Sequence, residues 1–283
     1  MKPQEVSASI VVYKNDREQV ISAIKSVLSA PMRITCTVVD NSPTPDLMQC
    51  VAECGAKYIH AGRNLGFGSG HNLVFREEAE ASEYHLVLNP DVHFAPEVPG
   101  ALYRFMNDNQ HVGLVMPKIL NSDGTEQRLC KQLPSPLDLL SRRFLGGLGR
   151  ILFAAQLSKY ELRHLDLNVT RQIPCLSGCF MFLRSAALRD VGFFDERYFM
   201  YMEDVDLCRR IGAKYETIFY PKVAVTHGYA KGSYSSGKLL KYHMQSAIKY
   251  FGKWGWFYDS EQRKLNQKTA PLTRVHLTRE STA

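Results

Sequence analysis

The sequence lacks a hydrophobic run long enough to cross a membrane. A transmembrane helix needs about 20 consecutive apolar residues. The best candidate, residues 144–155 (FLGGLGRILFAA), is shorter and contains three glycines and an arginine. The first residues, MKPQEVSASIVVYKND, have neither the apolar core nor the small-residue cleavage site of a signal peptide. We therefore expect a protein that stays in the cytoplasm.

Closely paired cysteines are absent as well. The seven cysteines include no C-x-x-C pair, so neither a structural zinc site nor a redox dithiol is expected. An odd number of scattered cysteines fits free thiols in a reducing compartment.

Nucleic-acid-binding motifs, internal repeats and a dinucleotide fingerprint are also missing. The chain is nevertheless basic, with 35 lysines and arginines against 28 acidic residues and a formal net charge of +7. This excess predicts an anionic partner, which is a nucleotide, a membrane surface or nucleic acid. Nucleic acid is the weakest of the three, because no array of interleaved basic and aromatic residues is present. We expect no nucleic acid partner, and a NAD-linked oxidoreductase is a distant alternative.

The first 120 residues alternate between strand and helix signals. Short apolar runs typical of buried strands are separated by segments with apolar residues at helical spacing. This alternation predicts an α/β fold with a mostly parallel sheet and helices on both faces. The predicted strands are 7–13, 34–42, 56–61, 84–91 and 112–120, and the predicted helices are 17–29, one ending near 81 and one ending near 109.

Residues 133–172 break this pattern, because they mix proline, glycine, arginine and apolar residues without a firm period. A long segment of this kind inside a domain is usually a functional loop or lid. Order returns near residue 173, and a basic, aromatic stretch closes the chain after Lys231.

A carboxylate, Asp91, follows the apolar run that ends at Asn89-Pro90. Proline has no backbone N–H, so strand pairing should stop at Pro90. Asp91 would then lie at the carboxyl end of a central strand, where open α/β sheets bind ligands. Asn-Pro-Asp is also ordinary turn chemistry, and a structural role is the alternative.

Two further segments could contact a nucleotide. Polar residues follow the first two predicted strands, and Asp40 among them could accept hydrogen bonds from a ribose or a base, or could simply cap a turn. The loop 62–72 (GRNLGFGSGHN) is rich in glycine and contains Arg63. Glycines let a backbone approach a ligand closely and arginine pairs with phosphate, although a flexible turn before a helix would look similar.

A second acidic site lies in residues 198–210 (YFMYMEDVDLCRR), where Glu203, Asp204 and Asp206 precede two arginines. This order of charges suits the start of a helix without any catalysis. The aromatic and methionine-rich run before it could also desolvate one carboxylate and raise its pKa, as a general base requires. His227 ends another apolar run and is a candidate ligand or a structural histidine.

In this order, the motifs resemble those of a family-2 glycosyltransferase with the GT-A fold. The bacterial rhamnosyltransferases of O-antigen and cell-wall polysaccharide assembly are the most similar branch. The resemblance covers roughly residues 7–230, and residues 133–172 match nothing in it. It rests on several motifs together, which are SIVVYKND, VVDNS, RNLGFGSGHN, LNPD, SGCFMFLRSAAL, GFFDERYFMYMEDVDLCRR and THG.

The resemblance implies a metal-assisted transfer. The family's Asp-x-Asp motif holds a divalent metal against the sugar-nucleotide diphosphate, and here it reads Asn89-Pro90-Asp91. Asp91 and His227 would hold Mg²⁺ or Mn²⁺, and Arg63 would help to stabilise the departing diphosphate. The lost first carboxylate leaves metal dependence open. By resemblance Asp204 is the general base of an inverting reaction, and Glu203 is its nearest rival.

The resemblance also assigns the remaining binding residues and a domain plan. Residues 1–230 would form the catalytic domain, with a nucleotide-binding half at 1–120, a variable lid at 133–172 and an acceptor half at 173–230. Residues 231–283 would be a helical extension and tail. Ser177, Gly178 and Cys179 would contact the acceptor, and the donor would contact Val12, Tyr13, Asn15, Asp40, Arg63, Asn64, Gly66, Gly68, Asn72, Asn89 and Asp91.

The expected activity is transfer of L-rhamnose from dTDP-L-rhamnose to a polyprenyl-linked saccharide. The alternatives are the same fold with a UDP- or GDP-sugar donor, or a sugar-nucleotide-binding protein that has lost activity.

A lipid-linked acceptor implies work at the inner face of the cytoplasmic membrane. Residues 238–258 carry an apolar stripe, lysines and two tryptophans that suit a membrane interface, with residues 141–153 as a second contact. The stripe could equally pack on the catalytic domain. Its members are Leu240, Met244, Ala247, Ile248 and Phe251, flanked by Lys238, Lys241, Lys249, Lys253, Trp254 and Trp256.

Overall fold

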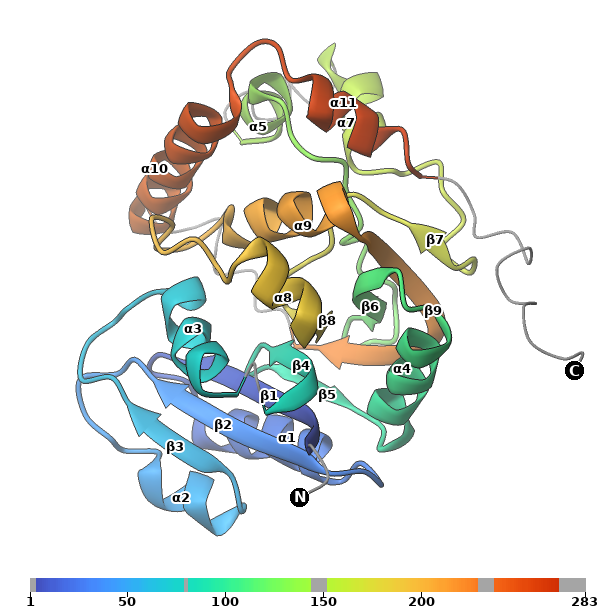
Figure 1. Cartoon of the computed structure of the whole chain (residues 1–283). Coiled ribbons are helices and arrows are strands. Elements are labelled where there is room, and N and C mark those ends of the chain that lie inside the picture. Colours follow the sequence, from blue (N-terminus) through green and yellow to red (C-terminus); the bar gives the residue numbers. More distant parts are fainter. Residues whose placement is uncertain (1–3, 79–80, 144–151, 229–236, 270–283) are drawn as a thin grey trace, which may run out of the picture.

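A nine-stranded sheet runs through the middle of the molecule (Figure 1). The computed structural model describes residues 4–78, 81–143, 152–228 and 237–269. The strand order is β3-β2-β1-β4-β8-β6-β9-β5, and β7 also pairs with β9. The strands are β1 (Gln4–Val12), β2 (Ile34–Asp40), β3 (Lys57–His60), β4 (Ser82–Leu88), β5 (Val92–Phe94), β6 (Val112–Leu120), β7 (Arg171–Gln172), β8 (Phe180–Arg184) and β9 (Glu216–His227).

The helices of the first half begin and end within a few residues of their predicted positions. The short helix α2 was not predicted, because six residues are too few to show a helical period. The helices are α1 (Arg17–Leu28), α2 (Met48–Glu53), α3 (Phe67–Glu78), α4 (Glu97–Asp108), α5 (Pro136–Arg143), α7 (Ala154–Tyr160), α8 (Ser185–Val191), α9 (Glu203–Lys214), α10 (Gly237–Trp254) and α11 (Ser260–Asn266).

Strands β1 to β4 pair in parallel, as the sequence predicts. Strand β1 is buried on both faces: Val6, Ala8, Ile10 and Val12 point one way, and two serines point the other. The serine hydroxyls are satisfied by His85, whose ring nitrogens lie 2.6 Å from Ser7 Oγ and 2.7 Å from Ser9 Oγ. Burial lowers the pKa of His85 to about 3, so this buried ring stays neutral.

The second half of the sheet is mixed rather than parallel. Strand β8 runs antiparallel to both β4 and β6, whereas β6 and β9 are parallel. The β4–β8 pairing continues past the strand ends, because the Asn89 N–H donates to the Cys179 carbonyl at 2.9 Å. The end of β9 is likewise joined to the segment after β4, since the Gly228 N–H donates to the Asp91 carbonyl at 2.7 Å. The chain segments around Asn89, Cys179 and His227 therefore meet at one edge of the sheet.

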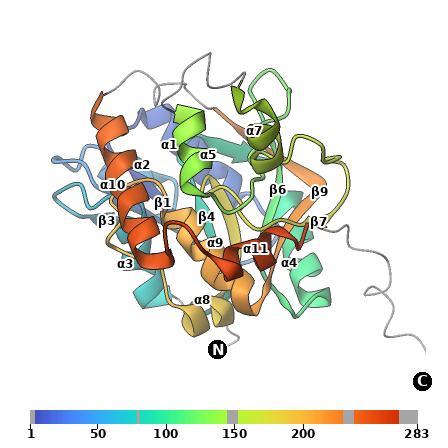
Figure 2. The same cartoon turned by 90° about the horizontal axis from the view of Figure 1, so that it is seen from above.

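Helices α5, α7, α10 and α11 lie on the far side of α9 from β1, β2 and β3 (Figure 1). Seen from above, α5 lies beside α10 (Figure 2), and Leu139 of α5 shares an apolar cluster with Tyr250 and Phe251 of α10. Over the described ranges, no helix combines the length and the apolar character that a membrane span requires.

A buried carboxylate, Asp206 of α9, joins this outer layer to the rest of the molecule. It is fully buried and accepts hydrogen bonds from Arg210 Nε (2.8 Å), Lys253 Nζ (2.6 Å) and Trp254 Nε1 (2.7 Å). Arg209, one residue before Arg210, forms ion pairs with both Asp259 and Glu261 at the start of α11 and stacks over the Trp254 ring. Ion pairs and ring stacking thus fix α10 and α11 against α9.

The predicted membrane-facing stripe is therefore partly used inside the protein. Phe251 is buried, Ala247 packs against the same cluster, and Lys253 is bound to Asp206. Lys249 donates to the Arg197 carbonyl at 2.5 Å. The expectation that Lys253 is available for lipid headgroups is wrong, because Asp195 and Asp206 already hold its ammonium group. Lys249 is exposed, and its contact with headgroups stays a prediction. Met244 and Ile248 remain 44% and 56% exposed. The second predicted contact, 141–153, lies largely outside the described residues.

Replacing Asp206 with alanine should lower the free energy of unfolding by about 3 to 5 kcal/mol, because it leaves cations of a buried network without their anion. Urea denaturation measures this loss. Asp190→Ala is the matched control, since Asp190 pairs with Lys214 at the surface, where both side chains are about half exposed, and it should cost less than about 1 kcal/mol. Equal losses in the two variants would contradict the role given to Asp206.

Candidate active site

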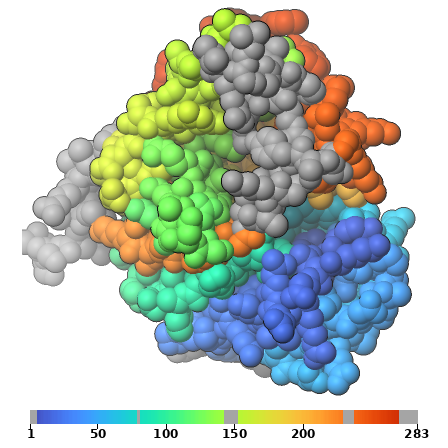
Figure 3. All heavy atoms as spheres, turned by 180° about the vertical axis from the view of Figure 1, so that it is seen from behind, coloured from blue at the N-terminus to red at the C-terminus, as the bar shows by residue number. Residues whose placement is uncertain are grey.

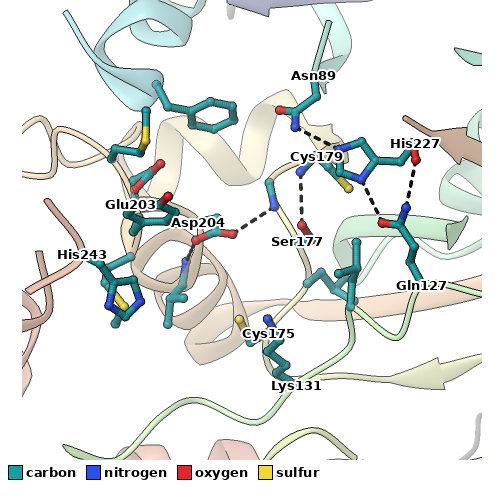
Figure 4. A pocket seen from close by; sticks show the side chains of 18 of the residues that line it. Asn89, Gln127, Lys131, Cys175, Ser177, Cys179, Glu203, Asp204, His227 and His243 are labelled. Atoms are coloured by element: carbon teal, nitrogen blue, oxygen red, sulfur yellow. Dashed lines mark hydrogen bonds between the residues drawn. The ribbon is translucent and has the colours of Figure 1, made fainter. Parts of the chain in front are cut away.

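A cavity of about 550 Å³ opens at the edge of the sheet where Asn89, Cys179 and His227 meet. Figure 4 shows Asp204 on one side of it and His227 on the other, with Ser177 and Cys179 between them. The lining comes from segments far apart in the sequence, and comprises Phe67, Asn89, Asn121, Gln127, Leu129, Lys131, Leu139, Tyr160, Cys175, Leu176, Ser177, Gly178, Cys179, Met200, Tyr201, Met202, Glu203, Asp204, Val205, His227 and His243.

The first turn of α9 presents two acids to this cavity. The backbone reaches the helix through two non-glycine residues in the left-handed region, Tyr201 (φ 67°) and Met202 (φ 68°). Such conformations cost roughly 1 to 3 kcal/mol each and are concentrated at functional sites. Asp204 Oδ2 accepts the N–H of Gly178 at 3.0 Å, so the carboxylate is held against the segment 177–179 that enters β8.

Glu203 differs from its neighbour in protonation. Burial, reinforced by the negative charge of Asp204, raises the pKa of Glu203 to about 8. Its Oε2 is buried, and within the described part of the chain it has no hydrogen-bond partner. A carboxyl group with this pKa is mostly protonated at neutral pH. Glu203 is therefore a poor proton acceptor there, and Asp204 is the better candidate for a general base.

His227 is held by both ends of the Gln127 amide. Gln127 Nε2 donates to the His227 carbonyl oxygen at 2.9 Å, and this oxygen can only accept. Gln127 Oε1 must then be the atom that lies 3.0 Å from His227 Nδ1. Nδ1 therefore carries a proton, which in the neutral ring leaves Nε2 as an acceptor.

The acceptor atom Nε2 faces a second acceptor. Asp91 Oδ1 lies 3.3 Å from His227 Nε2, and this buried oxygen has no hydrogen-bond partner among the described residues. The Asn89 amide nitrogen lies 3.4 Å from the same Nε2. Two facing acceptors of this kind fit a bound cation. The described residues contain no group of three or more His, Cys, Asp or Glu side chains that could hold a metal, so a metal here would take its other ligands from a bound molecule or water.

The predicted acceptor-binding residues line the cavity. Ser177, Gly178 and Cys179 lie on the segment that enters β8. Gly178 packs closely, since a Cβ there would lie 3.2 Å from Asp204 Cβ and would press on that side chain.

The donor-binding residues predicted at the first strand ends lie outside the cavity lining. Val12 ends β1 and Asn15 Oδ1 accepts the N–H of the half-exposed Tyr13 at 2.9 Å. Asp40 is 1% exposed, and its two oxygens accept from Ser42 N–H (2.7 Å) and Tyr58 O–H (2.7 Å). Its bonds in this structure are those of a turn, and its role in donor binding stays a prediction.

The glycine-rich loop serves packing in this structure. Asn64 Oδ1 accepts the N–H of Gly66 at 3.0 Å, and Arg63 is exposed. Gly66 has φ 86°, and a Cβ there would collide with the Phe199 carbonyl. The Phe67 N–H donates to that same carbonyl at 3.1 Å. The loop is thus bound directly to the segment that leads into α9.

Two more residues predicted to bind the sugar donor, Gly68 and Asn72, make contacts within the protein. A Cβ at Gly68 would lie 2.9 Å from Phe194 Cβ. The side-chain amide of Asn72 bonds both backbone groups of Phe194, at 2.8 and 3.0 Å. Both residues therefore fasten α3 to the segment before α9. Their contact with a donor stays a prediction.

Several lining residues lie in segments whose pattern does not single them out. Gln127 and Lys131 follow β6 in an irregular segment, and Leu139 and Tyr160 lie in the aperiodic stretch 133–172. His243 was not predicted as a site residue, because it lies among the apolar residues of α10. A folded structure was needed to bring these residues to one cavity.

A comparison with protein families decides the family. The model of glycosyl transferase family 2 matches residues 8–192, which is more than half of the chain. The chain belongs to glycosyltransferase family 2. The resemblance noted from the motifs is thereby confirmed.

Curated relatives of this glycosyltransferase include two rhamnosyltransferases. The N-acetylglucosaminyl-diphospho-decaprenol L-rhamnosyltransferase of Mycobacterium tuberculosis is 27% identical over 240 residues, which cover 78% of this chain and 76% of the relative. Rhamnosyltransferase WbbL of Escherichia coli is 22% identical over 254 residues, which cover 86% and 92%. A hexosyltransferase of low-salt glycan biosynthesis from Haloferax volcanii is 27% identical over 208 residues, covering 73% and 61%.

Solved structures agree on the fold of the glycosyltransferase. A GalNAc transferase crystallised with UDP, GalNAc and Mn²⁺ has a TM-score of 0.65 at 13% identity. It covers 98% of this chain, which spans about half (53%) of that protein. A mannosyltransferase from Pyrobaculum calidifontis, in complex with GDP-Man and Mn²⁺, has a TM-score of 0.57 at 14% identity and covers 89% of this chain and 65% of its own. The predicted GT-A fold is confirmed.

Glu203→Gln should remove a pH dependence of stability. The pKa of Glu203 is higher in the folded protein than in the unfolded chain, so its contribution to stability is full below about pH 4.5 and is lost as pH rises through about 8. The variant should therefore gain stability relative to the wild type between pH 5 and pH 8, by a few kcal/mol at about 1.4 kcal/mol per pKa unit.

Urea denaturation at several pH values measures this difference. Glu97→Gln is the control, because Glu97 is exposed in the first turn of α4. A difference between Glu203→Gln and the wild type that does not change with pH would show that Glu203 is ionised in the folded protein.

Proposed function

We propose that this glycosyltransferase moves L-rhamnose from dTDP-L-rhamnose to a lipid-linked saccharide, with inversion at the anomeric carbon. One observation carries the proposal: a single cavity has Asp204 on one side and the Asn89–His227 edge of the sheet on the other. A base and a diphosphate site that face each other are what an inverting transfer needs. The Mycobacterium and Escherichia relatives are rhamnosyltransferases, which supports the choice of rhamnose.

The reaction follows from the placement of charge. The acceptor hydroxyl attacks the anomeric carbon from the side of Asp204, and the bond from that carbon to the diphosphate breaks on the opposite side. Asp204 takes the hydroxyl proton, while the electron pair of the broken bond leaves with the nucleoside diphosphate. Gly178 N–H orients the Asp204 carboxylate. The neutral Glu203 beside it adds no second negative charge near the base.

Asp91 and His227 are the residues that would hold Mg²⁺ or Mn²⁺. Their facing acceptor atoms fit a cation, and Gln127 keeps His227 in the tautomer that presents Nε2. A bound metal would supply positive charge to stabilise the departing diphosphate. Asn89, in place of a carboxylate, leaves the protein fewer negative ligands. The Mn²⁺ in two structural neighbours supports a divalent cation.

Residues 1–230 would act as the catalytic domain, and 231–283 would be an extension that faces the membrane. What supports a membrane role is an exposed apolar surface on the outer layer, with Leu137 and Leu140 on α5, Met244 and Ile248 on α10, and Trp256, Phe257 and Tyr258 after it. Helix α10 contains no acidic residue, and its lysines Lys238, Lys241 and Lys249 are exposed. The enzyme would work peripherally at the inner face of the cytoplasmic membrane, where its acceptor is anchored.

A panel of dTDP-, UDP- and GDP-sugars, read by release of nucleoside diphosphate, tests the reaction. Release and transfer should be greatest with dTDP-L-rhamnose and should fall on addition of EDTA. Asp204→Asn should keep donor binding but lose transfer by about 100-fold or more, the usual scale for a general base. Asp108→Asn, at an exposed site on α4, is the control. Near-normal turnover by Asp204→Asn would refute the base. No release from any donor would leave only a sugar-nucleotide-binding protein.

Sedimentation with anionic vesicles tests the membrane role. Each basic residue near an anionic surface contributes about 1 kcal/mol, so replacing the exposed Lys238 and Lys241 with glutamine should weaken binding by roughly 30-fold at low salt. The control replaces Lys25 and Arg33, which are exposed near β2, in the same way. Equal binding by the two double variants, or no binding by the wild type, would contradict this role.

A further inference from the structure

The cavity extends beyond Asp204 into a region that the transfer reaction does not yet use. Its walls there are Leu129 and Lys131 after β6, Leu139 of α5, Tyr160 of α7, and Cys175 and Leu176. We infer that this region binds the diphosphate and the first part of the lipid of the acceptor, with Lys131 pairing with the diphosphate. The inference rests on the proposed function, because it requires an acceptor carried on a lipid diphosphate.

The backbone fixes the position of Lys131 relative to the base. Lys131 and Cys175 exchange two backbone hydrogen bonds, of 3.1 and 3.2 Å. Cys175 precedes Gly178, whose N–H binds Asp204, by three residues. Three residues span at most about 11 Å of extended chain. One sugar whose hydroxyl lies at Asp204 can therefore bring the phosphate on its anomeric oxygen toward Lys131. Figure 4 shows Lys131 beside Cys175, with Ser177 and Asp204 farther along the cavity.

The charges of the lining favour an anion at this place. Among the lining residues that the structure describes, Lys131 is the one lysine or arginine, and the acids Glu203 and Asp204 lie at the start of α9. Lysine is a common phosphate ligand in proteins, and hydrogen bonds between ionised groups are about twice as strong as neutral ones. Lys131 would supply positive charge for the phosphates of the acceptor. These phosphates would then lie beyond Asp204, away from the metal site proposed at Asp91 and His227.

The walls around Lys131 suit an isoprenoid chain. Leu129, Leu139 and Tyr160 give the region an apolar lining. Leu139 faces inward from α5, whereas Leu137 and Leu140 of the same helix are 43% and 48% exposed. The apolar lining thus continues, across one helix, to the exposed surface that we assign to the membrane. Figure 3 shows the opposite face from Figure 1, with green and yellow surface on one side of the upper part and the orange surface of α10 on the other.

This inference assigns two residues of the segment 133–172 to the binding of the acceptor. Leu139 and Tyr160, which come from its two described helices, form the acceptor wall of the cavity. The segment was expected to be a lid. Here it forms a wall that selects the acceptor by its lipid and its charge.

Calorimetry with farnesyl diphosphate tests the site without depending on either sugar. The protein is first saturated with Mn²⁺ and dTDP, so that the probe is kept from the donor site. Lys131→Met should weaken binding of the probe by about tenfold, and Lys131→Glu should abolish it. Lys131→Arg, which keeps the charge, should retain most of the affinity. Lys159→Met is the matched control, because Lys159 is exposed on α7 next to Tyr160, and it should change nothing.

A purely structural role for Lys131 would give a different result. Farnesol lacks the diphosphate, and its binding should be the same in the wild type and in Lys131→Met. Equal weakening of farnesol and farnesyl diphosphate, or equal weakening by Lys159→Met, would overturn the inference. Failure of the proposed function is seen separately, in the donor panel. A protein that binds farnesyl diphosphate through Lys131 but cleaves no donor would keep this site and lose the transfer reaction.

Discussion

The buried carboxylate of Asp206 is the interaction on which the catalytic half of this glycosyltransferase depends. It lies two residues after the candidate base and accepts from groups on α9 and α10 together. Arg210, one of its partners, also donates to the carbonyls of Val191, Gly192 and Phe193. One anion thus ties together the helix that carries the acids, the segment in front of it and the C-terminal helix. These contacts, which help to set the position of Asp204, lie behind the described lining of the cavity.

The sequence could predict the features that depend on local patterns. Buried parallel strands read as apolar runs, so β1 to β4 were found with small errors at their ends. The fold and Asp91, Asp204 and His227 as candidates followed from short motifs whose order matches a family. The mixed pairing around β8 was not visible, because strand direction depends on how the irregular segment before β8 returns to the sheet.

Residues that act through long-range contacts could not be predicted. Gln127 shows no pattern of its own, and its importance comes from two hydrogen bonds to His227, one hundred residues later, of which one is to the backbone carbonyl and one to the ring. Asn72 and Gly68 resembled ligand contacts in the sequence because amides and glycines serve both purposes. In the fold they hold α3 against Phe194. The stripe on α10 was divided in the same way: its inner half became core and its outer half stayed exposed.

The contact between Gly66 and Phe199 has a consequence for how substitutions spread through the enzyme. The loop that precedes α3 rests directly on the backbone of the segment that leads, through Tyr201 and Met202, to the two acids. The two segments are in direct contact, because even one added carbon atom at position 66 would collide with the Phe199 carbonyl oxygen. A movement of the glycine-rich loop should therefore be passed to the start of α9, which carries Asp204. A substitution that shifts the backbone of residues 62–68 should also shift the start of α9, with the carboxylates of Glu203 and Asp204.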